Sequence, residues 1–122
     1  MTQHTYKSYD KNNIFAKILK GDIACQKVYE DAHALAFHDI HPKSPIHVLV
    51  IPKGEYTCFD DFIKFGSDVE IMGFFKAVQK VSGLVGILEP GWRLIANSGS
   101  DGGQEVPHFH VHLLGGKSLG EI

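Results

Sequence analysis

Histidine and apolar residues alternate without interruption over residues 108–113, which read HFHVHL. Successive side chains of a β-strand point to opposite faces, so this pattern predicts a strand with one apolar face and one histidine face. We expect the apolar members to enter a hydrophobic core and the three histidines, His108, His110 and His112, to line the other face. A fold for this chain therefore buries the apolar face of the strand and leaves the histidine face available for a functional site.

Five segments rich in β-branched and aromatic residues predict strands. They cover residues 25–30, 32–40, 46–52, 91–97 and 106–114. Parallel pairing needs a long crossover connection, whereas most of these segments follow one another closely, so the sequence favours antiparallel neighbours. We therefore predict a five-stranded antiparallel sheet.

Helical patterns lie before and between these strands. Asn12 or Asn13 can cap a short helix over residues 14–20. A long helix begins after Ser67, whose hydroxyl forms a capping box with the acidic residue three positions later, and residues 59–65 form a short helical piece. With one long and one short helix packed on one face of the sheet, the fold class is α+β.

The composition suits one domain that binds neither nucleic acid nor a membrane. The chain has 122 residues, 43% of them hydrophobic, which is enough for one core. Lys and Arg number 12 against 14 Asp and Glu, and no basic stripe could follow a phosphate backbone. The polar N-terminus lacks a secretory signal, and no apolar run approaches the roughly 18 residues that cross a bilayer. We expect a cytoplasmic protein with a flexible lead-in at residues 1–12 and a single domain at residues 13–122.

The aligned histidines allow three explanations: a metal site, a nucleophilic site, or a polar face without chemistry. Alternate side chains stand roughly 6.7 Å apart along a strand, so His108 and His112 are separated by roughly 13 Å. One metal ion cannot easily bridge that distance, and a metal site would need two of these histidines and a third ligand from elsewhere. A polar face without chemistry is a weak explanation for three strictly alternating histidines.

A glycine-rich loop directly before the histidine strand favours the nucleophilic explanation. Residues 97–104 read NSGSDGGQ, and their glycines let backbone N–H groups approach a phosphate without obstruction. An imidazole can attack an electrophile while a neighbouring group fixes its tautomer. Loop and histidines together predict phosphorus chemistry that needs neither a metal nor another cofactor.

The run HFHVHLL over residues 108–114 resembles the histidine triad pattern, in which histidines alternate with hydrophobic residues. Its flanks GGQEV and GG, and the segment AFHDIHPKSPIHVLVIPK, are similar to the Hint branch of that family, the histidine triad nucleotide-binding proteins. The similarity extends from about Asn13 to Gly116. It implies the histidine triad fold in a two-fold homodimer with a joined sheet, for whose interface Phe74 and Phe75 would be suitable exposed aromatic residues.

The resemblance also implies roles for individual residues. His110 matches the attacking nucleophile, His112 the histidine that contacts the phosphate, and His108 with His47 the residues that support the nucleophile. Asp39 matches a residue that accepts hydrogen bonds from both ribose hydroxyls. The other implied substrate contacts are Ile40 at the base, the base-pocket residues Ile14, Phe15, Ile18, Ile23, Phe37 and Leu49, and the phosphate-side residues Asn97, Gly103, Gln104 and Glu105.

Several of these residues also have a purely structural explanation. Phe37 and Leu49 could be ordinary core residues, since most apolar strand residues serve packing. Asp39 could simply cap the turn that follows its strand. Glu105 stands where some Hint proteins carry a serine, and its carboxylate would repel a phosphate unless it is protonated or turned aside. We expect Glu105 to lie near the leaving group.

The resemblance implies a hydrolase that cleaves P–N bonds of adenosine 5′-phosphoramidates, or aminoacyl adenylates, through a nucleotidyl-histidine intermediate. The expected partner is a purine nucleotide substrate with an AMP-type product. Two alternatives stay open: a dinucleoside polyphosphate hydrolase, and a nucleotide-binding or partner-binding protein whose turnover is incidental. A galactose-phosphate nucleotidyltransferase is disfavoured, because that branch has proline at the position of Phe109.

Overall fold

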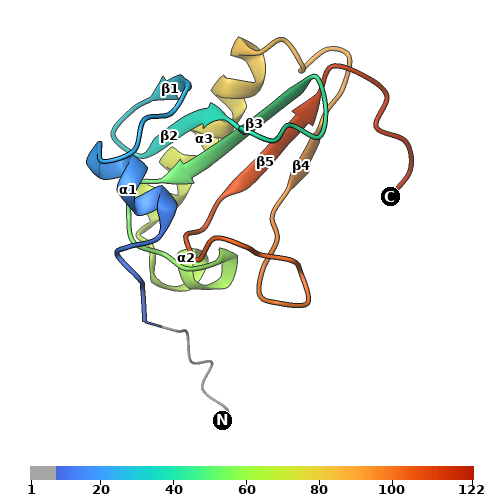
Figure 1. Ribbon diagram of the computed structural model, residues 1–122. Helices are drawn as coiled ribbons and strands as arrows, with labels where there is room; N and C mark the ends of the chain where they lie inside the picture. The colour runs from blue at the N-terminus through green and yellow to red at the C-terminus, as the bar shows by residue number, and fades with distance from the viewer. Residues whose placement is uncertain (1–7) are drawn as a thin grey trace.

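The computed structural model describes residues 8–122, and over these residues it confirms the α+β fold. Five antiparallel strands form a sheet in the order β1-β2-β3-β5-β4 (Figure 1). The strands are β1 (Lys27–Glu30), β2 (Ala34–His38), β3 (Ile46–Pro52), β4 (Arg93–Ile95) and β5 (Val111–Gly115). The helices are α1 (Ile14–Lys20), α2 (Phe59–Phe65) and α3 (Asp68–Leu84). Helices α1 and α2 lie where the sequence predicts a short helix and a short helical piece, so the described residues contain one short helix more than the expected fold class counted.

The two faces of the sheet carry separate hydrophobic clusters. Helices α2 and α3 cover one face, where Phe62 and Phe74 pack against alternate strand residues. On the other face α1 places Phe15 against Phe37, with ring centroids 5.6 Å apart. Figure 1 shows α1 in front of the sheet and α3 behind it. The expectation that all helices lie on one face is therefore wrong, because β2 and β3 are apolar on both faces and each face needs a cover.

The local signals at the helix ends are confirmed. The side chain of Asn13 accepts a hydrogen bond from the backbone N–H of Ala16 at 2.9 Å, and Gly21 ends α1 in the left-handed region with φ 83°. Ser67 and Glu70 form the predicted capping box at the start of α3. These caps satisfy backbone groups that the ends of a helix leave without an intrahelical partner.

The histidine strand is shorter than its alternation predicts. β5 begins at Val111, opposite Val50, so continuing the register would place Phe109 opposite Pro52. Proline has no N–H to donate to a ladder, and the N–H of Phe109 donates instead to the carbonyl of Tyr56 at 2.7 Å. The alternation of faces nevertheless continues, because Phe109 stays in the cluster with α2 and α3 while the histidines stay on the α1 face.

One residue expected at a dimer interface lies in the core. Phe74 is fully buried, and its ring lies 5.3 Å from that of Phe62 and 5.4 Å from that of Phe109 between centroids. It is therefore not an exposed aromatic residue. Phe75 is half-buried at the edge of the same cluster.

The segment before α1 packs on the rest of the domain. Of the expected lead-in, residues 1–7 lie outside the described part of the chain. Lys11 forms an ion pair with Glu55 at 3.2 Å, and the ring of Tyr9 meets that of His108 edge to face, with centroids 5.6 Å apart. Within residues 8–122, no helix has the length and apolar character needed to cross a bilayer.

Candidate active site

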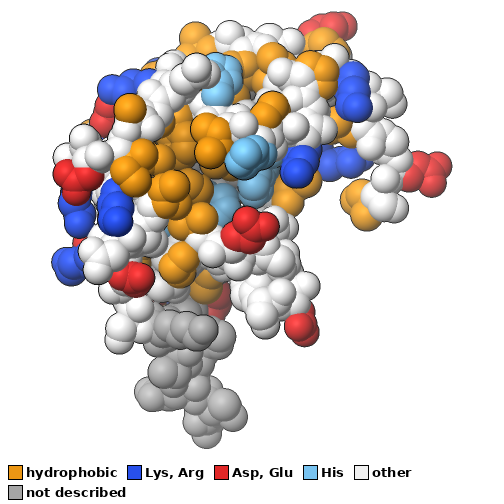
Figure 2. Space-filling model, viewed as in Figure 1, with side chains coloured by type: hydrophobic (Ala, Val, Ile, Leu, Met, Phe, Trp, Pro, Cys, Tyr) orange, Lys and Arg blue, Asp and Glu red, His pale blue; other side chains and the backbone are white. Residues whose placement is uncertain are grey.

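A cavity of about 530 Å³ opens on the α1 face of the sheet. His47, His110 and His112 line it, together with Asp39 and Glu105. Figure 2 shows histidines near the middle of this face, with hydrophobic side chains on one side and charged side chains close by. An apolar surface with a few convergent polar groups is the usual composition of a small-molecule site.

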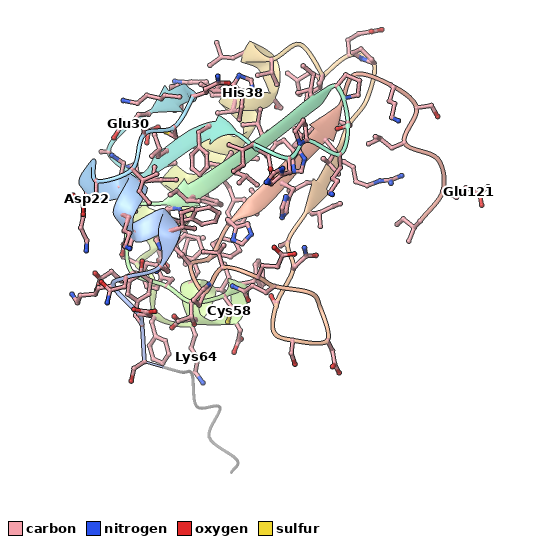
Figure 3. The ribbon with its side chains drawn as sticks, viewed as in Figure 1. Asp22, Glu30, His38, Cys58, Lys64 and Glu121 are labelled. Carbon is pink, nitrogen blue, oxygen red and sulfur yellow. The ribbon has the colours of Figure 1, made fainter. Side chains whose placement is uncertain are left out.

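Not every histidine of the described residues contributes to this cavity. Figure 3 shows ring side chains gathered on the near face of β3 and β5, whereas the labelled His38 lies apart from them at the end of β2. His38 is exposed and lines a neighbouring hollow. His33 lies against Gly73 of α3. The cluster on β3 and β5 is therefore a local arrangement and not a consequence of histidine content.

The ring of His110 is fixed by its own backbone. Its Nδ1 lies 2.7 Å from the carbonyl oxygen of His108. A carbonyl only accepts hydrogen bonds, so Nδ1 carries the proton and the neutral ring has a lone pair on Nε2. The residue is 6% exposed, its ring is edge-on to Phe15 at 5.0 Å between centroids, and burial lowers the pKa of His110. The site thus presents an unprotonated imidazole nitrogen, the form that a nucleophile needs.

A second chain of hydrogen bonds fixes the tautomers of His47 and His112. The backbone N–H of Lys43 donates to Nδ1 of His47 at 3.0 Å, so neutral His47 carries its proton on Nε2. That nitrogen lies 2.9 Å from Nδ1 of His112 and 3.4 Å from Oδ2 of Asp39. Nδ1 of His112 therefore accepts a hydrogen bond, and the proton of neutral His112 is on Nε2.

His110 and His112, which both line the cavity, therefore offer different chemistry. Burial lowers the pKa of His112 to about 4, and the nearby His110 and His47 add to the shift. Burial also lowers the pKa of His47. With neutral rings, His110 offers a lone pair and His112 offers an N–H, and their ring centroids are 5.1 Å apart. A phosphoryl group bound over them would meet an attacking nitrogen and a hydrogen-bond donor together.

His108 is fully buried and does not line the cavity. Its Nε2–H donates to the carbonyl of Pro52 at 3.0 Å, and its Nδ1 lies 2.5 Å from the hydroxyl oxygen of Tyr9. Burial lowers the pKa of His108 to about 4. His108 therefore acts on the site through its carbonyl, which orients His110.

Asp39 directly follows β2 and lies where two hollows meet. One carboxylate oxygen accepts from the backbone N–H of His41 at 2.8 Å, and the other faces His47. Asp39 and Ile40 also line the second hollow, of about 450 Å³. Ile40 is 81% exposed, so its side chain is open to a ligand there. Asp39 both caps its turn and reaches the cavity, so its structural and functional explanations are compatible.

The glycine-rich loop supplies part of the cavity wall. Asn97, Gly103 and Glu105 line the cavity. Gly103 has φ 75°, a backbone conformation that favours glycine. The charge of Glu105 acts to raise the pKa of His110, although burial and the net shift are in the opposite direction.

Gln104 has a different position from the one expected for a substrate contact. Its Nε2 donates to the carbonyls of Thr57 and Val106 at 2.6 and 3.0 Å, and its Oε1 accepts from the N–H of Gly99 at 3.1 Å. It does not line the cavity. The side chain of Gln104 instead holds the loop to the segment before α2.

The six apolar residues expected at the base pocket are only partly brought together. Phe15 and Leu49 line the cavity. Phe37 is buried in the cluster under α1. The remaining three, which do not line the cavity, are Ile14, Ile18 and Ile23.

The cavity also contains residues for which the sequence suggested no role. His41 and Lys43 belong to the turn between β2 and β3, and both are exposed. Their one signal was the position of this turn directly after Asp39. Further residues of this kind are Ile95, Val106 and Leu114.

Asp39, His47 and His112 could hold a metal ion. One ligand atom from each lies within 4.8 Å of the others, and two imidazoles with a carboxylate suit zinc. The ion would replace the hydrogen bond between His47 and His112, because the same nitrogens face each other. The group uses one of the three alternating histidines and takes two ligands from elsewhere, whereas strand geometry suggested a site with two of the three.

Comparisons with known proteins agree with this fold. The chain matches the HIT domain over residues 20–119. It is 54% identical over 116 residues to an uncharacterized 13.2 kDa HIT-like protein of Azospirillum brasilense, with 95% of each chain covered. It is 42% identical over 110 residues to a 14 kDa zinc-binding protein of Zea mays, with 90% of this chain and 86% of the relative covered. A solved HIT family hydrolase from Legionella pneumophila has a TM-score of 0.80 and 39% identity, over 89% of this chain and 96% of that one.

Fold and site together define a histidine triad domain with an imidazole cluster on β3, on β5 and on the residues directly before β5. The chain belongs to the HIT family, and its structural neighbours include HIT family hydrolases.

Proposed function

We propose that this protein is a purine nucleoside phosphoramidase, which hydrolyses the P–N bond of adenosine 5′-phosphoramidates and also accepts aminoacyl adenylates. The observation that carries the proposal is the hydrogen-bond pattern, which leaves a lone pair on Nε2 of His110 and a proton on Nε2 of the neighbouring His112. This pair suits attack on a phosphorus atom whose oxygens need a donor. The glycine-rich loop and Asn97 line the same cavity and supply further polar groups.

The proposed reaction has two steps. Nε2 of His110 attacks the α-phosphorus, the P–N bond breaks, and the departing amine takes a proton from solvent. Water then attacks the phosphorus of the nucleotidyl-histidine, loses its proton, restores the free ring of His110 and releases a nucleoside monophosphate. Throughout, the Nε2–H of His112 donates to a phosphoryl oxygen, while His47 keeps the proton of His112 on that nitrogen.

The remaining residues of the site support a nucleotide as substrate. The carboxylate of Asp39 offers acceptor oxygens for ribose hydroxyls at the point where the two hollows meet. Phe15 and Leu49 provide apolar surface for a base in the main cavity, and Ile40 provides it in the second hollow. We propose that the base lies against these apolar residues, and that the ribose at Asp39 separates it from the phosphate over His110 and His112.

Intact-mass measurement after incubation with adenosine 5′-phosphoramidate tests the proposal. Under an acid-free quench, the wild type is expected to form AMP and to show an adenylyl adduct on His110. His110→Ala should show neither product, while the matched control His33→Gln, on the α3 face, should behave like the wild type. A wild type without adduct or hydrolysis near neutral pH would refute the proposal.

A comparison of substrates and the His110→Ala variant separate the alternatives. A dinucleoside polyphosphate hydrolase would cleave diadenosine polyphosphates faster than the phosphoramidate. A nucleotide-binding protein with incidental turnover would keep its biological role in His110→Ala, provided that this variant still binds AMP.

We also propose a two-fold homodimer with a joined sheet, acting in the cytoplasm. Strand β4 forms one edge of the sheet in the described residues and carries Leu94, which is 45% exposed. An edge strand with exposed apolar residues is suited to pairing with a second copy. Size-exclusion chromatography with light scattering measures the mass, and a monomer at working concentrations would contradict the dimer.

A second candidate function is the binding of zinc. The close approach of Asp39, His47 and His112 favours it, as does the description of the Zea mays relative as zinc-binding. Calorimetric titration of the metal-free protein with zinc tests the candidate. Binding that Asp39→Asn weakens and His33→Gln leaves unchanged would support it, whereas no binding by the wild type would exclude it.

A further inference from the structure

We propose that Tyr9 is a positioning residue for the histidine nucleophile: its hydroxyl fixes the ring of His108 and, through the carbonyl of His108, the tautomer and orientation of His110. The inference rests on the proposed function for its kinetic consequence. Its geometric content holds for any reaction that uses the lone pair of His110.

The direction of each hydrogen bond follows from the acceptors. The carbonyl of Pro52 can only accept, so Nε2 of His108 must carry a proton. In the neutral ring Nδ1 is then a bare acceptor, and the Tyr9 hydroxyl at 2.5 Å donates to it. The buried ring of His108 therefore has both nitrogens satisfied, and the donor on one side is a residue from the segment before α1.

The contact places Tyr9 one step from the reacting nitrogen. His108, whose ring Tyr9 holds, also supplies the carbonyl that accepts from Nδ1 of His110 at 2.7 Å. Residues 108–110 lie outside the ladder of β5, so strand pairing does not hold this carbonyl. The peptide unit that contains this carbonyl is held at its N–H, since Phe109 donates to the carbonyl of Tyr56 at 2.7 Å. The ring contacts of His108 with Pro52 and Tyr9 hold the residue on the other side of the carbonyl and so help to keep it aimed at His110.

The segment that carries Tyr9 is itself anchored by the residues that follow Tyr9. The N–H of Asn13, the cap of α1, donates to the carbonyl of Asp10 at 3.1 Å, and Lys11 pairs with Glu55 at 3.2 Å. The ring of Tyr9 also meets that of His108 edge to face. Burial raises the pKa of Tyr9, so the hydroxyl keeps the proton that it donates.

Tyr9→Phe tests the inference, because it removes the hydroxyl and keeps the ring. The matched control is Tyr29→Phe on strand β1, which loses a hydroxyl that donates to Asp31. The first measurement is the ¹⁵N chemical shifts of the imidazole nitrogens, which report tautomer and hydrogen bonding directly. In Tyr9→Phe the Nδ1 signal of His108 should move towards that of a free acceptor, and the Nδ1–H of His110 should exchange faster with solvent. Tyr29→Phe should leave both signals unchanged.

The second measurement is hydrolysis of adenosine 5′-phosphoramidate. We expect Tyr9→Phe to lower kcat by about tenfold, the effect of one misplaced hydrogen bond, while KM changes by less than about twofold, since Tyr9 does not line the cavity. A residue that only stabilises the fold would lower Tm and leave kcat and the His110 signal of the folded protein unchanged, and that result overturns the inference. If the wild type does not hydrolyse the phosphoramidate, the proposed function fails, and the ¹⁵N shifts alone decide the role of Tyr9.

Discussion

Nε2 of His47 lies 2.9 Å from Nδ1 of His112, and one arrangement of protons satisfies both neutral rings. The other nitrogen of His47 already accepts from the backbone of Lys43, so His47 must donate to His112. The turn after β2 thereby decides which nitrogen of His112 can donate to a substrate. A backbone amide outside the histidine strand thus takes part in setting up the site.

Removing the donor of His47 should therefore slow hydrolysis. In His47→Ala, Nδ1 of His112 loses its donor, the ring populates both tautomers, and the rate should fall by about tenfold. His47→Gln keeps an amide donor and should retain more activity than His47→Ala. Steady-state hydrolysis of adenosine 5′-phosphoramidate measures the series, with His33→Gln as control. Equal rates in all the variants would show that the tautomer of His112 is irrelevant.

Acidification should weaken the fold between pH 6.5 and about pH 4. His108 and His112 have pKa values of about 4 in the folded chain because they are buried, against about 6.5 in an unfolded chain. The unfolded chain binds more protons in this window, so stability is complete above pH 6.5 and is lost as the pH falls towards 4. For His108 the full loss is roughly 3 kcal/mol, and the partly exposed His112 contributes less.

Urea unfolding at pH 7 and pH 5 measures this loss. Carboxylates such as Glu30, whose pKa is lowered to about 2 by hydrogen bonds from Lys27 and Lys53, lose their contribution only below their unfolded pKa. They therefore do not explain a change above pH 5. Equal free energies of unfolding at the two pH values would contradict the neutral, buried state of these histidines.

Replacing Glu105 should change the preference among leaving groups. The carboxylate is exposed at the cavity and should attract a cationic amine and repel an anionic one. Glu105→Gln removes this charge, so the preference for cationic over neutral leaving amines should shrink by about threefold, a typical effect of one solvent-screened charge. Competition between the two kinds of phosphoramidate measures the ratio of kcat/KM values. An unchanged ratio in Glu105→Gln and in Glu105→Ser would remove Glu105 from leaving-group selection.

Removing the side chain of Gln104 should weaken substrate binding more than turnover. Gln104→Ala loses the hydrogen bonds that hold the glycine-rich loop to Thr57 and Val106. Ordering the loop when substrate binds then costs conformational entropy, so KM should rise by about five- to tenfold while kcat changes less. Ser100→Ala, in the exposed tip of the same loop, is the control. A fall in kcat with constant KM would instead indicate that Gln104 contacts the reacting group.

Much of the fold was predictable because its signals are local. The alternation of residues 108–113, the cap at Asn13 and the capping box at Ser67 each depend on a few neighbouring residues. The position of α1 on the second face of the sheet was missed. Strands β2 and β3 carry apolar residues on both faces, and this pattern does not show which helix covers which face. The burial of Phe74 was missed for a related reason. Helical spacing predicts which residues of α3 form its apolar stripe, but it does not show which surface that stripe packs against.

The candidate site was predictable in its residue types and not in its proton positions. The triad pattern pointed to His110 and His112, and the structure places both in one cavity with His47 and Asp39. The tautomers depend on Lys43, Pro52 and Tyr9, which are far from the triad in sequence. The bracing role of Gln104 depends likewise on Thr57, 47 residues away.

Strand β5 is paired with β3 on one side and with β4 on the other. Because side chains alternate along a strand, an insertion or deletion of a single residue within this segment would exchange the faces of all segment residues on one side of the change, turning imidazoles there into the core and core residues there into the cavity. Folding and chemistry would then be lost together, with no substitution at any site residue. The spacing of residues 108–115 is therefore as strict a requirement for this protein as the identity of its histidines.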